Sequence, residues 1–468
     1  MAALQGPAAI PDFSAMIGHD VSRRLPPPLP VLEPCRSAGG HAFFPMIPGA
    51  TAEAAIWCVA GLATAGVIAR PYRWPEAVWA LGGAMVLLAF GLISWETAWR
   101  GVGQGLDVYL FLAGMMLLSA VAQQEGLFDW AAAMATAHAR GSPARLFTLV
   151  FMVGVAVTMF LSNDATAVVL TPAVYAATRA ARVSNPLPYL LVCAFIANAA
   201  SFVLPISNPA NLVVFSAGEM PPLLDWLALF GLASLVAIAT TYAMLKLTQH
   251  RALAAEILAR EVEEPHLSFS AKLAAAGIAA TALVLIAASA WGVPLGLPTL
   301  ITGVLTAAGV LLIERKHPAT VVRAISWDVL LLVAGLFVLV EALNQTGLAS
   351  TLAEALQRGA DAAPGWTAAA AGVLVAFGSN LTNNLPAGLI AAGVVQAAAA
   401  PDKVAGAILI GVDLGPNLSI TGSLATILWL TALRRAGLHM GARQFLGRGS
   451  VVMIPALVLS LATLLLIA

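Results

Sequence analysis

The feature of this sequence that most constrains its fold is a series of long apolar segments, four of which are interrupted midway by polar residues. A membrane-spanning helix needs about 20 consecutive apolar residues. The segments that approach or reach this length without a break are residues 54–69, 74–94, 107–124, 224–248, 271–291, 298–314, 327–345 and 450–468. The interrupted segments are residues 144–182, 187–217, 366–399 and 404–433, each broken by a polar cluster with Gly or Pro.

The charge of the chain supports the same interpretation. Only 10% of the residues are charged while 60% are hydrophobic, so a soluble domain of this composition is excluded. Because only helices and closed barrels satisfy their backbone in lipid, and these segments are of helical length, the sequence predicts an all-α membrane protein. The net charge of zero gives no reason to expect nucleic acid as a partner.

The loops sort by charge if 144–182 and 366–399 are re-entrant hairpins and 187–217 and 404–433 are broken spanning helices. One side of the membrane then carries Arg70, Arg73, Arg140, Arg145, Arg179, Arg182, Lys246, Arg251, Arg260, Lys272, Arg315, Lys316, Arg323, Arg434, Arg435, Arg443 and Arg448. The other side carries only Arg100, Arg358 and Lys403 after residue 46. By the positive-inside rule the first side is cytoplasmic. This topology has about ten crossings, two hairpins and an external N-terminus in the cell inner membrane.

The ends of the predicted membrane domain follow from composition. Residues 1–45 are Pro-rich and have neither helical periodicity nor the apolar core of a signal peptide, so we expect a disordered extension. Met46 is a candidate start codon, in which case residues 1–45 are not translated. We therefore divide the remainder into a first repeat at 46–248, a cytoplasmic linker at 249–270 and a second repeat at 271–468.

An internal repeat relates the two halves. The stretch from Leu106 to Gly126 matches the stretch from Trp327 to Gly347 without a gap, and a shift of 221 residues takes Asp107 onto Asp328. The charge-derived topology starts the two copies on opposite sides, so the repeats are inverted, which is typical of secondary transporters. Both carboxylates stand at the start of a predicted helix, where we expect them to cap free amides.

The four polar clusters fall where hydrophobicity predicts the middle of the bilayer. Irregular backbone is tolerated there only when it lines a cavity or is buried in protein. We predict that their amides and hydroxyls bind the substrate, through Ser162, Asn163, Thr166, Ser207, Asn208, Asn211, Ser379, Asn380, Thr382, Asn383, Asn384, Asn417, Thr421 and Ser423. A carboxylate at this depth costs about 2.5–3.5 kcal/mol, so we expect Asp164 and Asp413 to titrate or to bind a cation, and we predict that they couple protons.

Several classes of site are absent from the sequence. Cys35, Cys58 and Cys193 are widely spaced, so neither a disulfide framework nor a thiolate metal site is indicated, and we predict no cofactor. No Arg or Lys falls in any polar cluster, which argues against direct binding of an anion. The chain has no GxGD and no HExxH motif, so we predict a transporter and not an intramembrane hydrolase.

The second-repeat cluster resembles a known signature. The run from Asp413 to Trp429 reads DLGPNLSITGSLATILW and is similar to the signature of the arsenite and antimonite efflux permeases. Residues 379–386, which read SNLTNNLP, the pair Asn163 and Asp164 with Thr171 and Pro172 behind it, and the stretch 207–211 also resemble that family. The resemblance covers the chain from about residue 53, and its first-repeat motifs are shared with sodium/proton antiporters and dicarboxylate carriers. One departure is Asn198, where the family has an aspartate.

The resemblance implies extrusion of arsenite and antimonite, as neutral trihydroxides, in exchange for protons, and a cytosolic ATPase as a possible subunit. The nearest alternative is a sodium/proton antiporter or a sodium-coupled dicarboxylate transporter of the same fold. A dicarboxylate carrier should show a Ser-Asn-Thr type motif in both repeats, whereas the second repeat here reads Thr421-Gly422-Ser423. An ion channel is a further alternative, although paired hairpins around a midplane site favour alternating access.

Overall fold

The computed structural model describes residues 49–216, 220–259 and 266–467, and within them it is helical without any strand. The predicted extension 1–45 and the candidate start Met46 lie outside the described residues, as do residues 260–265 of the predicted linker. Every uninterrupted apolar segment forms a helix. These helices are α1 (Gly49–Ala69), α2 (Glu76–Ala89), α4 (Leu106–Gln124), α11 (Leu223–Ala254), α12 (Phe269–Ala290), α13 (Gly296–Glu314), α15 (Trp327–Gln345) and α21 (Ala442–Ile467).

The four interrupted segments are broken where the sequence predicts. The first hairpin consists of α6 (Pro143–Phe160), α7 (Asn163–Ala165), the π-helix η3 (Thr166–Leu170) and α8 (Thr171–Ala180), and the second of α17 (Pro364–Thr382) and α18 (Asn384–Ala397). The first broken helix consists of α9 (Leu187–Ala199), η4 (Pro205–Ser207) and α10 (Pro209–Val214), and the second of α19 (Asp402–Leu414), η5 (Gly415–Leu418) and α20 (Leu424–Arg435). Prolines at 205, 209 and 416 lack an N–H donor, which favours a break at those positions.

Four short helices are not assigned from the apolar pattern. They are α3 (Trp95–Gln104), α5 (Leu127–Ala139), α14 (Ala319–Ala324) and α16 (Leu348–Ala362). Helices α3 and α16 are amphipathic, so a search for continuously apolar segments passes over them. A capping signal marks the start of α3, because the Ser94 hydroxyl accepts a hydrogen bond from the Thr97 amide at 3.1 Å.

The predicted fold class is confirmed, since the helices form two repeats related by a shift of 221 residues. This shift takes the start of α5 onto that of α16 and the start of α6 onto that of α17. The packing is reciprocal as well, because α4 packs against α13 while α2 packs against α15. Equivalent glutamines make equivalent contacts: Gln124 Nε2 donates to the Thr320 carbonyl at 3.0 Å, and Gln345 Nε2 donates to Thr97 Oγ1 at 3.0 Å.

The number of crossings explains the inversion. Each repeat crosses the membrane five times: through three long helices, through α2 or its longer equivalent α13, and through one broken helix. The hairpin of each repeat returns to the side on which it begins. Five crossings is an odd number, so the second repeat begins on the side opposite to the first. Eight helices among the described residues, α6 included, are long and apolar enough to cross a membrane by length and composition.

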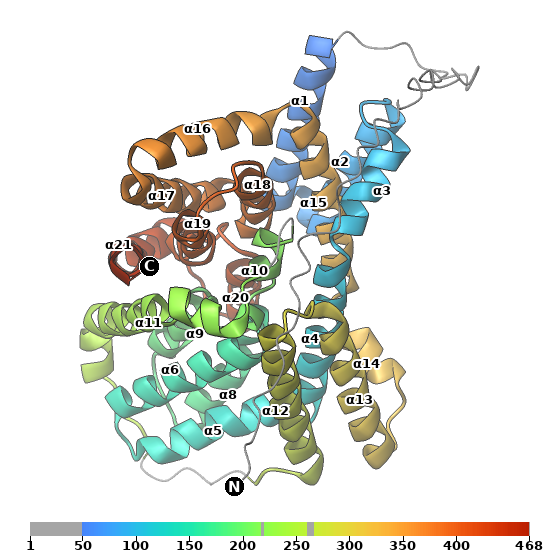
Figure 1. Ribbon diagram of the computed structural model, residues 1–468. Helices are drawn as coiled ribbons and strands as arrows, with labels where there is room; N and C mark the ends of the chain where they lie inside the picture. The colour runs from blue at the N-terminus through green and yellow to red at the C-terminus, as the bar shows by residue number, and fades with distance from the viewer. Residues whose placement is uncertain (1–48, 217–219, 260–265, 468) are drawn as a thin grey trace, which may run out of the picture. The chain divides into compact units, whose positions relative to one another are not determined.

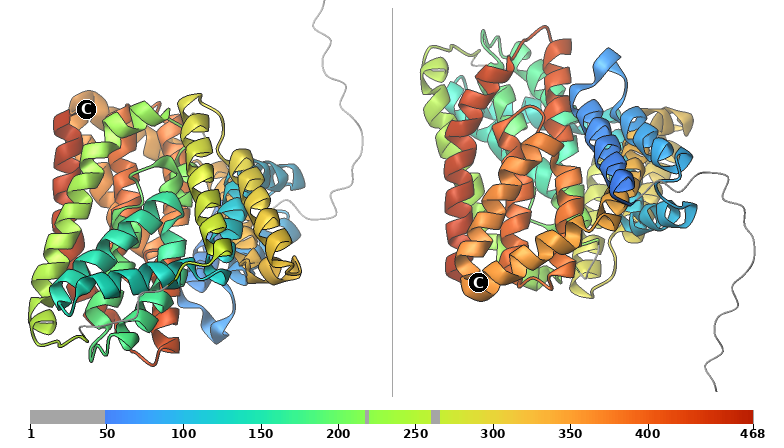
Figure 2. Two further views of the ribbon diagram at one scale, coloured as in Figure 1. Left: turned by 90° about the horizontal axis from the view of Figure 1, so that it is seen from below. Right: turned by 90° about the horizontal axis from the view of Figure 1, so that it is seen from above.

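The helices of residues 49–467 pack in two groups (Figures 1 and 2). The first group contains α1 to α4 and α12 to α15, and it lies on the right in Figure 1. The second group contains both hairpins and both broken helices, with α11 packed against α21, α17 against α19 and α6 against α9. All four polar breaks therefore belong to the second group, where they face α4 and α15 of the first.

Asp107 has the structural role that the sequence predicts, but it caps a different helix. Its Oδ1 accepts a hydrogen bond from the Gly296 amide, at the start of α13, at 2.7 Å. No side chain caps the start of α4 itself. The carboxylate thus joins α4 of the first repeat to α13 of the second, and its charge complements the positive end of the α13 dipole.

Replacing Asp107 by alanine should lower the free energy of unfolding by about 1 kcal/mol, because a helix cap between the repeats is lost. The measurement is thermal or denaturant unfolding of the purified protein in mixed micelles. Asp328→Ala is the matched control, since Asp328 occupies the equivalent position and is exposed. Equal effects of the two substitutions would contradict the capping role of Asp107.

Candidate functional site

Residues of three polar clusters, together with the start of α20 just after the fourth cluster, line one small cavity. It is lined by Asn163 and Asp164 from the first hairpin tip, Asn208 and Pro209 from the first broken helix, Asn384 and Leu385 from the second hairpin tip, Leu424 and Ala425 from the second broken helix, and Leu112 and Val329 from α4 and α15. Its volume is about 10 Å³, which is room for about one water molecule. Both repeats therefore contribute side chains to the wall of this cavity.

The first hairpin tip presents an amide and a carboxylate to this cavity. Ser162 Oγ accepts a hydrogen bond from the Ala165 amide at 3.2 Å and so begins the short helix α7. Thr166 Oγ1 lies 2.8 Å from Thr158 Oγ1, which ties the second arm of the hairpin to the first. The hydroxyls of Ser162 and Thr166 are therefore engaged within the hairpin, and Asn163 and Asp164 remain as its polar groups in the cavity wall.

The second hairpin tip is held by the second broken helix. Asn380 Nδ2 donates to the carbonyls of Ala376 and Gly415 at 2.8 and 2.9 Å, and Asn380 Oδ1 accepts from Ser419 Oγ at 2.6 Å. Thr421 Oγ1 donates to the Asn380 carbonyl at 3.1 Å. These bonds join the two elements into one unit.

The turn of the second tip lies at Asn383, whose φ of 75° is positive. Its ψ of 153° lies outside the left-handed helical region, in a part of φ/ψ space that residues with a side chain rarely adopt, so the turn is strained. Its Oδ1 accepts from the Leu385 amide at 3.4 Å, while the Asn384 amide donates to the Gly422 carbonyl at 2.9 Å. The turn therefore fixes the position at which the Asn384 side chain enters the cavity wall.

The two broken helices are joined across the repeats by buried polar side chains. Asn208 Nδ2 donates to Asp413 Oδ1 at 2.6 Å, and both residues are buried. Asn198 Nδ2 donates to Asn417 Oδ1 at 3.0 Å, and Asn417 Nδ2 donates to the Phe195 carbonyl at 3.0 Å. Each broken helix is thus anchored to the other at the point where both lose their helical hydrogen bonds.

A shift of 215 residues relates the broken helices, since it takes the start of α9 onto that of α19 and the start of α10 onto that of α20. By this shift Asn198 is equivalent to Asp413, and Asn208 is equivalent to Ser423. Both members of the latter pair cap a helix, because Asn208 Oδ1 accepts from the Ala210 amide at 3.0 Å and Ser423 Oγ accepts from the Thr426 amide at 3.1 Å. The two repeats therefore have the same arrangement of helices here, but the carboxylate of Asp413 corresponds to the neutral amide of Asn198.

The predicted site residues divide into two sets. Asn163, Asp164, Asn208 and Asn384 line the cavity. A second set of predicted residues does not line the cavity, and their side chains form hydrogen bonds with nearby backbone atoms or with one another. They are Thr166, Ser207, Asn211, Ser379, Asn380, Thr382, Asn383, Asp413, Asn417, Thr421 and Ser423. Ser162 lines an adjoining cavity.

A vestibule of about 90 Å³ adjoins the cavity and shares Asp164 with it. Its wall includes Met115, Ser119 and Gln123 of α4, together with Ala324 and Ser326 before α15. Gln123 lies beside the end of α4, and nearby Glu125 forms an ion pair with Lys316 at 2.7 Å. The vestibule therefore extends from Asp164 along α4 toward its C-terminal end.

Several of these residues were not predicted from the sequence. Ser119 and Gln123 belong to an uninterrupted apolar helix, where single polar residues carry little signal. Their spacing of four residues places them on one helix face, which is a signal that could have indicated a polar lining. Thr426 was also missed, although it follows the N-cap Ser423 by three residues.

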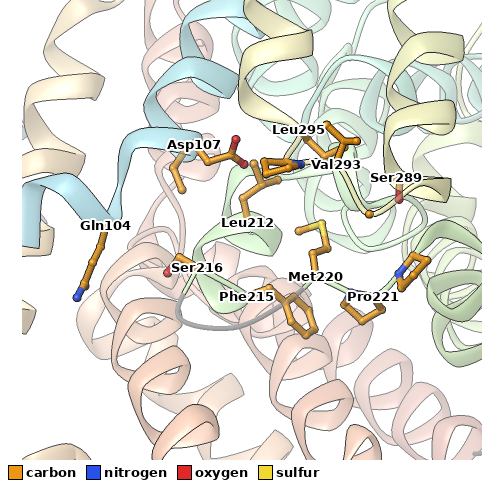
Figure 3. Close-up of a pocket in the computed structure, with 14 residues that line it drawn as sticks. Gln104, Asp107, Leu212, Phe215, Ser216, Met220, Pro221, Ser289, Val293 and Leu295 are labelled. Carbon is orange, nitrogen blue, oxygen red and sulfur yellow. The ribbon is translucent and has the colours of Figure 1, made fainter.

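A second and larger cavity, of about 420 Å³, lies at the start of α4 (Figure 3). Figure 3 shows the Asp107 carboxylate pointing toward the segment that carries Val293 and Leu295. Pro222 and Ser289 also line this cavity, whereas none of the residues predicted to bind substrate or protons does. The candidate site is therefore the smaller cavity between the hairpin tips.

Comparison with known proteins identifies the chain as a membrane transporter. A family model described as a citrate transporter matches residues 64–414. An arsenical pump membrane protein of Escherichia coli is 26% identical over 401 residues, which is 83% of this chain and 91% of the relative. One of Yersinia enterocolitica is 27% identical over 388 residues, covering 80% of this chain and 87% of the relative. The predicted resemblance to arsenite permeases is confirmed.

Among solved structures, the YdaH transporter of Alcanivorax borkumensis has a similar fold. Its TM-score is 0.52 and its sequence identity is 16%, over 79% of this chain and 87% of that one. Its description reports an unusual topology. An uncharacterized transporter of Mycobacterium tuberculosis is also 26% identical, over 393 residues that cover 80% of this chain and 89% of the relative.

Proposed function

The chain belongs to the citrate transporter family of membrane transporters, and from this premise we propose that it extrudes arsenite and antimonite from the cytoplasm in exchange for protons. The observation that carries the proposal is the lining of the cavity. Its polar groups are three amides and one carboxylate, and no Arg or Lys is among the described residues that line it. Amides both donate and accept hydrogen bonds, as a neutral trihydroxide requires.

The charge of the cavity argues against a citrate-like substrate. Recognition of a carboxylate is typically made by Arg or Lys, which form charge-assisted hydrogen bonds with it. Here Asp164 carries the same sign as such a substrate. The relatives of E. coli and Y. enterocolitica, named as arsenical pump membrane proteins, support the arsenite assignment independently.

We propose that the proton is carried by Asp164 and Asp413. A neutral substrate cannot be expelled by the membrane potential alone, so a coupled ion must supply the work. Asp164 lies in the cavity wall, where substrate and proton can exclude one another. Asp413 lies behind Asn208 and is fully buried.

The proposed orientation is an inner-membrane protein with an external N-terminus and a cytoplasmic loop at 249–270. The basic loops support it by the positive-inside rule. In this orientation the end of α4 that carries Gln123, in the vestibule wall, lies toward the cytoplasm. A cytosolic ATPase subunit, if one joins the permease, would dock on this basic face.

The proposed function is tested by transport into everted membrane vesicles that are acidified inside. We expect arsenite to accumulate while the pH gradient is present and to leak out when an ionophore collapses it, with vesicles lacking the protein as the control. The alternative, sodium or dicarboxylate transport, is favoured by the description of the family model as a citrate transporter. Accumulation of citrate, another carboxylate or sodium in place of arsenite would reject the proposal.

A further inference from the structure

Asp413 is separated from the cavity by a single side chain. It is fully buried, does not line the cavity, and accepts one hydrogen bond at Oδ1, from Asn208 Nδ2 at 2.6 Å. Its Oδ2 has no hydrogen-bond partner among the described residues. The side chains that interact with Asp413 are those of Ser201 and Asn208, and of these two only Asn208 lines the cavity.

Asn208 connects this carboxylate to the cavity. Its Oδ1 is occupied as the cap of α10, since it accepts from the Ala210 amide at 3.0 Å. Its Nδ2 has two hydrogens, of which one is given to Asp413. Asn208 also lines the cavity, so the second hydrogen is the donor that it can offer to a substrate.

We propose that Asp413 is a positioning residue that acts on the substrate through Asn208. The cap bond at one end of the amide and the Asp413 bond at the other fix the plane of the Asn208 side chain. Fixing this plane directs the remaining N–H at the cavity before a substrate arrives, which lowers the cost of binding. The proposal rests on the proposed function, because it names how the same site is held ready.

The equivalent positions of the two repeats supply suitable substitutions. Asn208→Ser introduces the residue found at the equivalent position 423, so it keeps a helix cap and removes the Nδ2 donor. Asp413→Asn introduces the residue found at position 198 and keeps an oxygen that can accept from Asn208. Asp413→Ala removes that acceptor.

The test is the KM for arsenite exchange across vesicles without a pH gradient. We expect Asn208→Ser and Asp413→Ala each to raise KM about tenfold with little change in maximal rate, which corresponds to the loss of about one hydrogen bond. The double variant should also show about a tenfold increase, because both changes remove the same interaction. Asp413→Asn should restore KM to within about threefold of wild type.

Two results would overturn the proposal: a hundredfold increase in the double variant, or an Asp413→Asn protein as weak as Asp413→Ala. The matched control is Asn198→Ala, which removes an equally buried side chain at the equivalent position, outside the cavity. It should leave the coupling between residues 208 and 413 unchanged.

A second measurement does not depend on the substrate. The infrared band of the Asp413 carboxyl group, identified by its loss in Asp413→Asn, should shift in Asn208→Ser and stay in place in Asn198→Ala. If the wild-type protein moves no arsenite but the band shifts, the proposed function fails and the contact between Asp413 and Asn208 stands. An unshifted band rejects the positioning role whatever the substrate is.

Discussion

Vesicles that contain the Asp164→Asn protein should fail to accumulate arsenite under a pH gradient. Asp164 is the titratable group among the described residues that line the cavity. Asparagine has nearly the same shape and hydrogen-bonding capacity but cannot bind a proton at neutral pH. We therefore expect accumulation to fall to the level of vesicles without the protein, while exchange of arsenite in the absence of a gradient keeps a KM within about threefold of wild type.

The control for this prediction is Asp328→Asn, which removes an exposed carboxylate outside the cavity and should leave accumulation unchanged. If Asp164→Asn vesicles still concentrate arsenite under the gradient, Asp164 is not the proton carrier. Asp413→Asn applies the same test to the second carboxylate. Loss of accumulation with exchange retained would assign proton coupling to Asp413 as well.

A methyl group at Gly411 should destabilise the protein by about 2 to 3 kcal/mol. Gly411 of α19 and Gly415 at the start of η5 both pack against the backbone of α17. A Cβ at Gly411 would meet the carbonyl oxygen of Gly372 and come within 3.1 Å of the Ala376 backbone nitrogen. Backbone atoms cannot turn aside, so the helices would have to separate. Small residues at such contacts are typical of helix pairs in membranes.

The matched control is Gly378→Ala on α17, where an added Cβ meets no heavy atom within 4 Å. Because alanine favours a helix by about 1 kcal/mol over glycine, this substitution should be neutral or stabilising. Unfolding of both variants in mixed micelles gives the comparison. A Gly411→Ala protein as stable as Gly378→Ala would show that α17 and α19 do not need this close contact.

The close contact also matters for the site, because it holds the second hairpin to the second broken helix. Asn380 on α17 bonds to the Gly415 carbonyl and to Ser419. A helix pair forced apart at Gly411 would move both elements relative to Asn384 in the cavity wall. We therefore expect any Gly411→Ala protein that folds to bind arsenite more weakly.

The sequence determined the fold of this protein to a large extent. A membrane-spanning helix needs a long apolar segment, so hydropathy alone located the eight uninterrupted helices and the four broken segments. The match around Asp107 and Asp328 revealed the repeat, because a shift that preserves helix contacts must preserve their residue pattern. The short helices α3, α5, α14 and α16 were not predicted; α3 and α16 are amphipathic, and a helix with one polar face does not require a continuous apolar run.

Tertiary structure decided which polar residues meet the cavity. Composition placed Asp164 and Asp413 in the same class, as carboxylates at mid-membrane depth. The structure separates them, because the hairpin tip directs Asp164 into the cavity wall while Asn208 stands between Asp413 and that wall. Likewise Asn384 lines the cavity whereas Asn380, four residues earlier, holds the second broken helix.

The physical reason is that burial at mid-membrane depth follows from local sequence, whereas the direction of a side chain depends on the backbone breaks around it. An unwound segment has no fixed periodicity, so spacing along the chain does not tell which of its side chains share a face. Contacts between segments some 200 residues apart, such as Asn208 with Asp413 and Asn198 with Asn417, fix those directions. The sequence alone therefore determined that a polar site lies between the repeats, and only the packing of the two repeats decided which side chains form it.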